Sequence, residues 1–278
     1  MTAQALYFTL ALIGVGAFSG LSAGMFGIGG GAIMVPALFY TFSALGVSSN
    51  ILMHCAIATS TAVIVVNSVR SVRSHNKRDS VDWTLLWPDK KFQSYAVWIG
   101  LGAFSAALWI APIMSFEALT LLFAVIAGLT ALQFVFGRPD WTFRQTVPKG
   151  FAPPIIGSLI GTVSSLMGIG GGSITVPLMS MCGVPMHKAV GTASGFGFAI
   201  AAPAVIGFMI SGMGVPDRPI MSLGYVNILG FLLIASTAFF FVPLGAKAAH
   251  SLRPERLKLV FGVCLLLVAI NMARKVLV

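Results

Sequence analysis

Apolar stretches of roughly 20 residues recur along the whole chain, separated by short polar segments. As a helix, a stretch of this length crosses the hydrocarbon core of a bilayer, which is roughly 30 Å thick. Only 9% of the residues are charged and 57% are hydrophobic, whereas a soluble domain carries about 25% charged residues. The chain is therefore expected to be an all-α, multi-pass membrane protein with little soluble mass.

Ten apolar segments can be drawn along the chain, and each is predicted to be a helix. They cover residues 6–24, 32–45, 51–69, 92–110, 117–136, 151–166, 174–182, 188–210, 222–242 and 257–273. The second is about 14 residues long and the seventh about 9, which is too short to cross a bilayer alone. The longest polar interruption, residues 70–91, holds six Lys and Arg residues.

Two closely similar glycine-rich stretches interrupt the apolar pattern. Residues 27–36 read Gly-Ile-Gly-Gly-Gly-Ala-Ile-Met-Val-Pro, and residues 168–177 read Gly-Ile-Gly-Gly-Gly-Ser-Ile-Thr-Val-Pro, 141 residues later. We call residues 27–31 the first glycine loop and residues 168–172 the second. Glycine reaches backbone angles that are closed to other residues and allows close approach to its amide. A glycine-rich interruption of the apolar sequence at the same place in each half is typical of the substrate site of a transporter built from two repeats.

Further correspondences between the halves indicate an internal duplication. Gly16 and Gly20 recur as Gly157 and Gly161, the stretch 54–59 aligns with 187–192, and Glu117 and Gln133 align with Glu255 and Asn271. The predicted organisation is a first transmembrane repeat over residues 1–137, a linker over 138–150 and a second repeat over 151–278.

The distribution of Lys and Arg favours one topology over another. If the short segments cross the membrane, the two repeats are inverted, and one side carries 14 of these residues against 3. If the short segments are re-entrant, the repeats are parallel and the split is 12 against 5. The positive-inside rule favours about ten crossings in two inverted five-helix repeats, with both termini outside the cytoplasm. The glycine loops would then be broken helices that meet near the midplane.

Several classes of function are disfavoured. All seven acidic residues lie in loops or at span ends, which argues against a cation pump or an acidic proton relay. The three cysteines, Cys55, Cys182 and Cys264, lack the spacing of a metal site, and neither a metal nor a cofactor is expected. The basic residues that give the net charge of +10 lie between apolar spans, where they set the orientation of the protein in the membrane. Nucleic-acid binding is therefore not expected either.

The polar groups left inside the membrane are neutral donors, which favour an anion. Free amides of a glycine loop that opens a helix converge with the positive end of the helix dipole. The predicted substrate-binding residues are Gly27, Ile28, Gly29, Gly30, Gly31, Thr59, Ser60, Gly168, Ile169, Gly170, Gly171, Gly172, Thr192 and Ser194, and His54, His187 and Lys188 are candidates for coupling or gating. The competing interpretation is that the glycines serve close helix packing and that the hydroxyls bond to their own helix carbonyls.

The doubled glycine motif, the stretch Ala-Val-Gly-Thr-Ala-Ser at 189–194 and Gly-Tyr-Val-Asn at 224–227 together resemble the TauE/SafE family of membrane anion permeases. The resemblance runs through nearly the whole chain. It implies transport of sulfite or small organosulfonates, commonly as export, across a bacterial cytoplasmic (inner) membrane. One departure is that the first repeat reads Ala-Thr-Ser-Thr at 58–61 where the second reads Gly-Thr-Ala-Ser at 191–194, so the hydroxyls are not arranged symmetrically.

The resulting prediction is a secondary transporter, an exporter of a small anion that works by alternating access. Its partners would be the small anionic substrate and the lipid bilayer, and a homodimer is compatible with this interpretation. A passive anion channel could have an identical lining and remains the alternative. A membrane-embedded enzyme would need a nucleophile, base or metal cluster, and no such grouping of residues is evident, so no catalytic residue is assigned.

Overall fold

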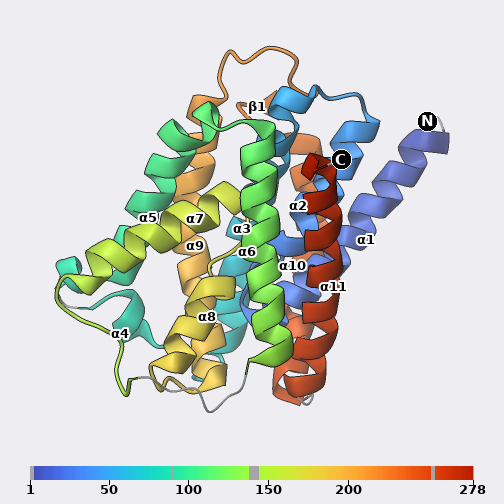
Figure 1. Ribbon diagram of the computed structural model, residues 1–278. Coiled ribbons are helices and arrows are strands. Elements are labelled where there is room, and N and C mark those ends of the chain that lie inside the picture. Colours follow the sequence, from blue (N-terminus) through green and yellow to red (C-terminus); the bar gives the residue numbers. More distant parts are fainter. Residues whose placement is uncertain (1–2, 89, 138–143, 252–253, 278) are drawn as a thin grey trace.

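The structure is a computed structural model that describes residues 3–88, 90–137, 144–251 and 254–277 (Figure 1). In this part of the chain every element is a helix, apart from one pair of two-residue strands. The first half contains α1 (Ala3–Phe26), α2 (Gly31–Ala44), α3 (Ser49–Asn76), α4 (Trp83–Leu86), η1 (Lys91–Gln93), α5 (Tyr95–Ser105), η2 (Ala106–Ile110), η3 (Ala111–Ile113) and α6 (Phe116–Phe136). The second half contains η4 (Pro153–Gly157), α7 (Ser158–Met167), α8 (Gly172–Met181), α9 (Met186–Ser211), β1 (Ser222–Leu223), β2 (Val226–Asn227), α10 (Ile228–Ser251) and α11 (Pro254–Leu277).

Among the described residues, six helices are long and apolar enough to cross a membrane. They are α1, α3, α5 with its η2–η3 extension, α6, α9 and α10. The expected all-α membrane fold is confirmed at this level. The other four predicted segments are present as the shorter apolar helices α2, α8 and η4–α7, and as α11. The number of crossings and the inversion of the repeats stay predictions.

Several helix boundaries differ from the sequence prediction, and the end of α3 is the first. The prediction ends this helix at residue 69, where the apolar pattern stops, but α3 continues to Asn76. Its last turns are bonded to α1: Ser71 Oγ donates to Ala23 O (3.4 Å) and His75 Nε2 donates to Gly24 O (2.8 Å). Contacts with α1 therefore sustain a helix that hydropathy alone would end.

The second difference is at the start of α10. The prediction begins a span at residue 222, but residues 222–227 form the antiparallel pair β1–β2, which turns at Gly224 with a φ of 58°. Asn227 then caps α10, because its Oδ1 accepts a hydrogen bond from Gly230 N at 2.8 Å. The helix also runs past residue 242, the predicted end, to Ser251.

The helices of the two halves are interleaved. α1 packs along α10, and α7 packs along α5. Gly16 lies against Ile234 and Gly24 against Val242, so α1 and α10 run parallel. Glycines on this stripe let the two backbones approach closely, as small residues do in membrane helix pairs. Each half therefore supplies the packing partner of the other half's first helix.

Two long helices form the centre of the molecule. Ser68 of α3 lies against Gly197 of α9, and Gly191 of α9 lies against His75 of α3, so the pair is antiparallel. α2 packs on α3, α8 packs on α9, and α6 packs on α11. Exchanging the two halves maps this set of packed pairs onto itself. In Figure 1, α1 begins and α11 ends at the same end of the molecule, opposite α4.

Candidate functional site

The two glycine loops lie directly against each other at the centre of the molecule. A Cβ added to Gly31 would meet the carbonyl oxygen of Gly168, and one added to Gly172 would meet the carbonyl oxygen of Gly27. These contacts are equivalent, because Gly172 and Gly168 follow Gly31 and Gly27 by 141 residues. The structure therefore brings together the two loops that the sequence marked, backbone against backbone.

Glycine is required in the loops for its backbone angles as well. Gly27 and Gly168 follow α1 and α7 with φ of 68° and 62°, and Gly29 and Gly30 have φ of 75° and 80°. A residue with a side chain rarely adopts this left-handed conformation. Gly27 and Gly168 thus terminate their helices as left-handed C-terminal glycines do, which turns the chain toward the opposite loop.

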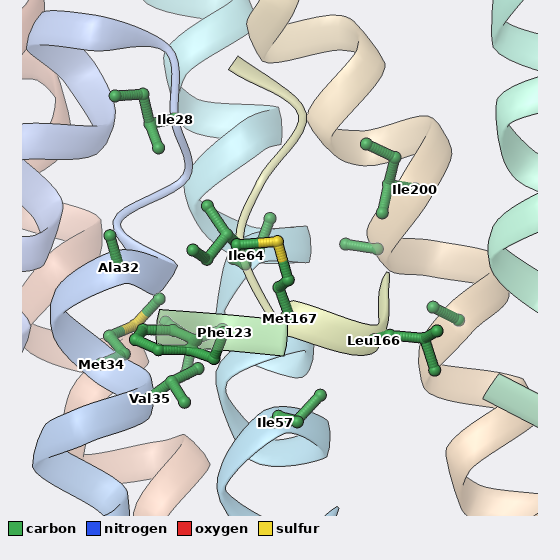
Figure 2. Packing of buried hydrophobic residues seen from close by; sticks show 14 of the residues in the cluster. Ile28, Ala32, Met34, Val35, Ile57, Ile64, Phe123, Leu166, Met167 and Ile200 are labelled. Atoms are coloured by element: carbon green, nitrogen blue, oxygen red, sulfur yellow. The ribbon is translucent and has the colours of Figure 1, made fainter. Parts of the chain in front are cut away.

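The surroundings of the crossing are apolar and tightly packed. Figure 2 shows Ile28, Ile64 and Met167 beside the loops, with Val35 and Phe123 next to them. All five side chains are at most 1% exposed. The packing interpretation of the glycines therefore describes their direct contacts well. It leaves the polar groups of the loop backbones to be explained.

Most backbone amides of the two loops lack acceptors, although those of Gly27, Gly168 and Ile169 donate to carbonyls of the preceding helices. Within the described chain, the amide nitrogens of residues 28–32 and 170–173 donate no hydrogen bond. These residues precede and open α2 and α8, and all are buried, so the amides lie at the positive ends of two helix dipoles. A buried amide without a partner costs about 1–3 kcal/mol. An anionic acceptor would satisfy several of these amides.

The loop carbonyls, in contrast, are bonded by side chains of α3. Ser60 Oγ donates to Gly168 O at 2.9 Å, and Asn67 Nδ2 donates to Gly29 O at 3.0 Å. Asn67 is fully buried, and its Oδ1 has no hydrogen-bond partner among the described residues. Ser60, predicted as a ligand, therefore lies at the second loop with its proton directed to a loop carbonyl.

Ser194 lies at the first loop. A Cβ on Gly27 would be 3.3 Å from Ser194 Oγ. That hydroxyl donates to Val190 O at 3.1 Å and lies 2.7 Å from Ser71 Oγ. The two predicted serines are thus placed crosswise, each central helix contacting the glycine loop of the other half.

Thr59 and Thr192 occupy equivalent places on α3 and α9. Thr59 Oγ1 accepts a hydrogen bond from Asn227 N, and Thr192 Oγ1 accepts one from Asp82 N, both at 2.9 Å. Each threonine is fully buried. Thr59 ties α3 to the segment that leads into α10, and Thr192 ties α9 to the segment that leads into α4 and α5. Neither hydroxyl donates its own proton to a described residue, so the donor capacity of both remains available.

The three candidates for coupling or gating are placed unequally. His54 is buried, with Nε2 2.9 Å from Ala111 O and its ring stacked on Tyr225 at 5.1 Å between centroids. His187 and Lys188 are exposed at the start of α9. His54 and His187 are therefore equivalent in the sequence repeat but not in their surroundings, because one is buried and the other exposed.

A cavity of about 750 Å³ opens beside the start of α9, at the end of the molecule that carries α4. Among the described residues, three lysines line it, Lys90, Lys149 and Lys188, together with one carboxylate, Asp82. That carboxylate is already engaged, because it accepts hydrogen bonds from Thr84 N (3.0 Å) and Thr84 Oγ1 (2.6 Å). The cavity therefore has an excess of positive charge and attracts anions.

Asp82, which lines this cavity, donates its backbone amide to Thr192 Oγ1 of α9. Cys182 also lines the cavity.

Charged side chains are confined to the surface in the described part of the chain, where no Asp or Glu side chain is buried. Asp89 and Asp140 lie outside the described residues, and the side chain of Glu255 is likewise not described. The described residues contain no cluster of three His, Cys, Asp or Glu that could hold a metal ion. Cys55 and Cys182 are free thiols, and Cys264 lies outside the described side chains.

Sequence reasoning missed five residues that the structure places near the site, Asn67, Asp82, Asn227, Lys90 and Lys149. Asp82 and Asn227 carry a weak signal, because each follows a valine and the two Val-Asp and Val-Asn pairs lie 145 residues apart. The other three carry none, since a single asparagine in an apolar span or a lysine in a loop is common.

Comparison with known proteins gives a consistent result. The sequence model described as "Sulfite exporter TauE/SafE" matches residues 12–272. A "Probable membrane transporter protein" of Haemophilus influenzae is 34% identical over 270 residues, which cover 96% of this chain and 99% of that protein. A protein of the same description from Methanocaldococcus jannaschii is 25% identical over 252 residues, 90% of each chain. No solved structure gives a significant match.

Proposed function

The chain belongs to the sulfite exporter TauE/SafE family, and from this premise we propose that it exports a small sulfur-containing anion, sulfite or an organosulfonate. It is a multi-pass membrane transporter, in agreement with its relatives' description and its apolar helices. The proposed location is the cytoplasmic membrane of a bacterium, with both termini outside the cytoplasm. The excess of Lys and Arg in residues 70–91 supports that orientation.

The observation that carries the proposal is the set of buried, unpaired amides where the glycine loops cross. Leaving many buried donors unsatisfied is costly, and the described chain offers them no acceptor. A small oxyanion has several acceptor oxygens and a charge that suits two helix N-termini. Because the loops are in direct contact, the anion would bind at their edges after a small separation of the two halves.

The proposed route begins at the cavity lined by Lys90, Lys149 and Lys188. An anion drawn into this cavity would next meet the hydroxyl of Thr192, which still has a proton to donate. Thr59 would play the equivalent part at the other end of the molecule. The anion would pass the carboxylate of Asp82, which accepts hydrogen bonds from Thr84, while the three lysines keep the described lining positively charged.

For the mechanism we propose alternating access by two inverted five-segment repeats. The interleaved packing, in which α1 pairs with α10 and α7 with α5, supports this arrangement. The bonds of Thr59 with Asn227 and of Thr192 with Asp82 lie at corresponding places in the two halves. Rocking of one repeat against the other would open one of these contacts while the other stays closed.

Titration of the purified protein with sulfite, ethanesulfonate, acetate and propionate tests the substrate class. We expect sulfite and ethanesulfonate to bind more tightly than the carboxylates, and the triple change Lys90→Gln/Lys149→Gln/Lys188→Gln to weaken both by at least about tenfold. Lys77→Gln, an exposed change outside the cavity, is the matched control. Equal or tighter binding of carboxylates would overturn the substrate class, and unaltered binding in the triple variant would remove the cavity from the route.

A further inference from the structure

A second hollow shares no lining residue with the cavity of the proposed anion route, although residues of α4 line both. It is a groove of about 960 Å³ between α3, α4, α5 and α9. Its walls are almost wholly apolar, with Val97, Leu101 and Phe104 on one side and Phe198 and Pro203 on the other. Leu101 and Phe198 are 51% and 43% exposed. In a membrane protein such a groove faces lipid chains.

One end of the groove is polar and aromatic. Arg73, on the last turns of α3, lines this end together with Trp83 and Trp87. The two tryptophans are 52% and 64% exposed, and Trp83 Nε1 donates to Asn76 Oδ1 at 2.8 Å. Exposed tryptophans of this kind lie at the level of lipid headgroups. This end of the groove is therefore at the membrane–water interface.

Arg73 has no acceptor within the described chain. Its side chain makes no hydrogen bond or ion pair with any described residue, although a guanidinium offers five donors in a planar fork. Arg70, one turn earlier, differs: its Nε donates to Phe239 O (3.3 Å), and its guanidinium lies 4.0 Å from the centre of the Phe239 ring. The protein satisfies one arginine of this turn and leaves the other facing the groove.

We propose that the groove is a binding site for an anionic phospholipid, whose phosphate pairs with Arg73 and whose acyl chain lies along α5. Arginine binds phosphate with two parallel hydrogen bonds, and the neighbouring tryptophans flank the headgroup. Residues 96–104 of α5 provide roughly 12 Å of wall for the chain. The proposal is independent of which anion is transported.

The lipid also fits the charge of this end of the molecule. Residues 70–91 hold six Lys and Arg residues, and anionic lipids gather beside such segments at the cytoplasmic surface. A zwitterionic lipid offers the same chain but no net charge. Headgroup selectivity therefore distinguishes a built site from ordinary solvation of an apolar surface by lipid.

Quenching of tryptophan fluorescence by brominated lipids tests the site, because Trp83 and Trp87 line it. The purified protein would be reconstituted in mixtures of unlabelled lipid with brominated phosphatidylglycerol or brominated phosphatidylcholine. We expect the anionic lipid to be favoured about fivefold at these tryptophans, and Arg73→Gln to abolish the preference. The double variant Trp83→Phe/Trp87→Phe gives the quenching of the remaining tryptophans, which is subtracted.

Two matched variants make the result specific. Lys77→Gln removes a nearby exposed charge outside the groove and should keep the preference. Ala199→Phe fills the groove from α9, where Ala199 is half-buried, and should reduce quenching by both lipids at Trp83 and Trp87. Equal quenching by the two lipids in the unaltered protein would overturn the proposal. So would a preference that survives in Arg73→Gln, or one that Lys77→Gln abolishes to the same extent.

Discussion

Substitution of Gly31 by alanine tests whether the crossing of the glycine loops holds the two halves together. Gly31 is helical, with no unusual φ, so alanine changes nothing but the added methyl group. That methyl group would overlap the carbonyl oxygen of Gly168 and approach Ile169 Cα to 2.8 Å. Both partners are backbone atoms, which cannot rotate away as a side chain does. One loop must therefore retreat from the other.

The expected cost follows from this geometry. Overpacking a well-filled core by a methyl group costs about 1–3 kcal/mol, and contacts with backbone place Gly31→Ala near the upper end. At about 2–4 °C per kcal/mol for a chain of this size, the melting temperature should fall by about 6–12 °C. Gly172→Ala should behave alike, because its methyl group would meet the carbonyl oxygen of Gly27.

Thermal unfolding of the purified variants in detergent measures this effect. Gly14→Ala is the matched control, because Gly14 is also a helical glycine but has no atom within 4 Å of an added Cβ. Alanine there should leave the melting temperature unchanged or raise it slightly. If Gly31→Ala and Gly172→Ala melt like Gly14→Ala, the loops do not cross in contact, and the reasoning about their amides fails with them.

Three further predictions follow from the same geometry. Thr192→Val removes the acceptor of Asp82 N and should lower the free energy of unfolding by about 1–3 kcal/mol, whereas Thr192→Ser should retain most of the stability in chemical or thermal denaturation. Glu117→Gln should leave anion flux detectable in proteoliposomes, because this carboxylate is exposed; complete loss with normal expression would contradict an acid-free route. A topology reporter after Val278 should read outside the cytoplasm and one within residues 70–91 inside, and a cytoplasmic C-terminus would exclude the inverted ten-segment arrangement.

Local sequence signals predicted the helices around the loops closely. The predicted segment 32–45 is observed as Gly31–Ala44, and 174–182 is observed as Gly172–Met181. Both starts follow glycines, and both ends lie just before a left-handed glycine, Gly46 or Gly183 (φ of 76° and 79°), which are local properties. The doubled motif also marked the two loops as candidate site residues. The direct contact between the loops could not be predicted, because Gly31 and Gly168 are far apart in sequence.

The features that the sequence did not predict depend on tertiary contacts. Ser71 and His75 hold the last turns of α3 against α1. In the hydropathy pattern the same residues form a polar segment, which predicts the end of a span. The start of α10 is set by the side chain of Asn227, which an average over an apolar window conceals. The cationic cavity combines lysines from three separate segments, and no spacing in the sequence links Lys90 with Lys149 or Lys188.

Counterflow of labelled sulfite in proteoliposomes tests the central claim most directly, because it requires both the substrate and alternating access. Vesicles loaded with unlabelled sulfite should take up external labelled sulfite faster than empty vesicles, reach a transient maximum above equilibrium and saturate with concentration. Ethanesulfonate outside should compete, and acetate should not. Uptake that is indifferent to internal sulfite and rises in proportion to the gradient would contradict alternating access and indicate a channel, and absence of sulfite and sulfonate flux would contradict the substrate.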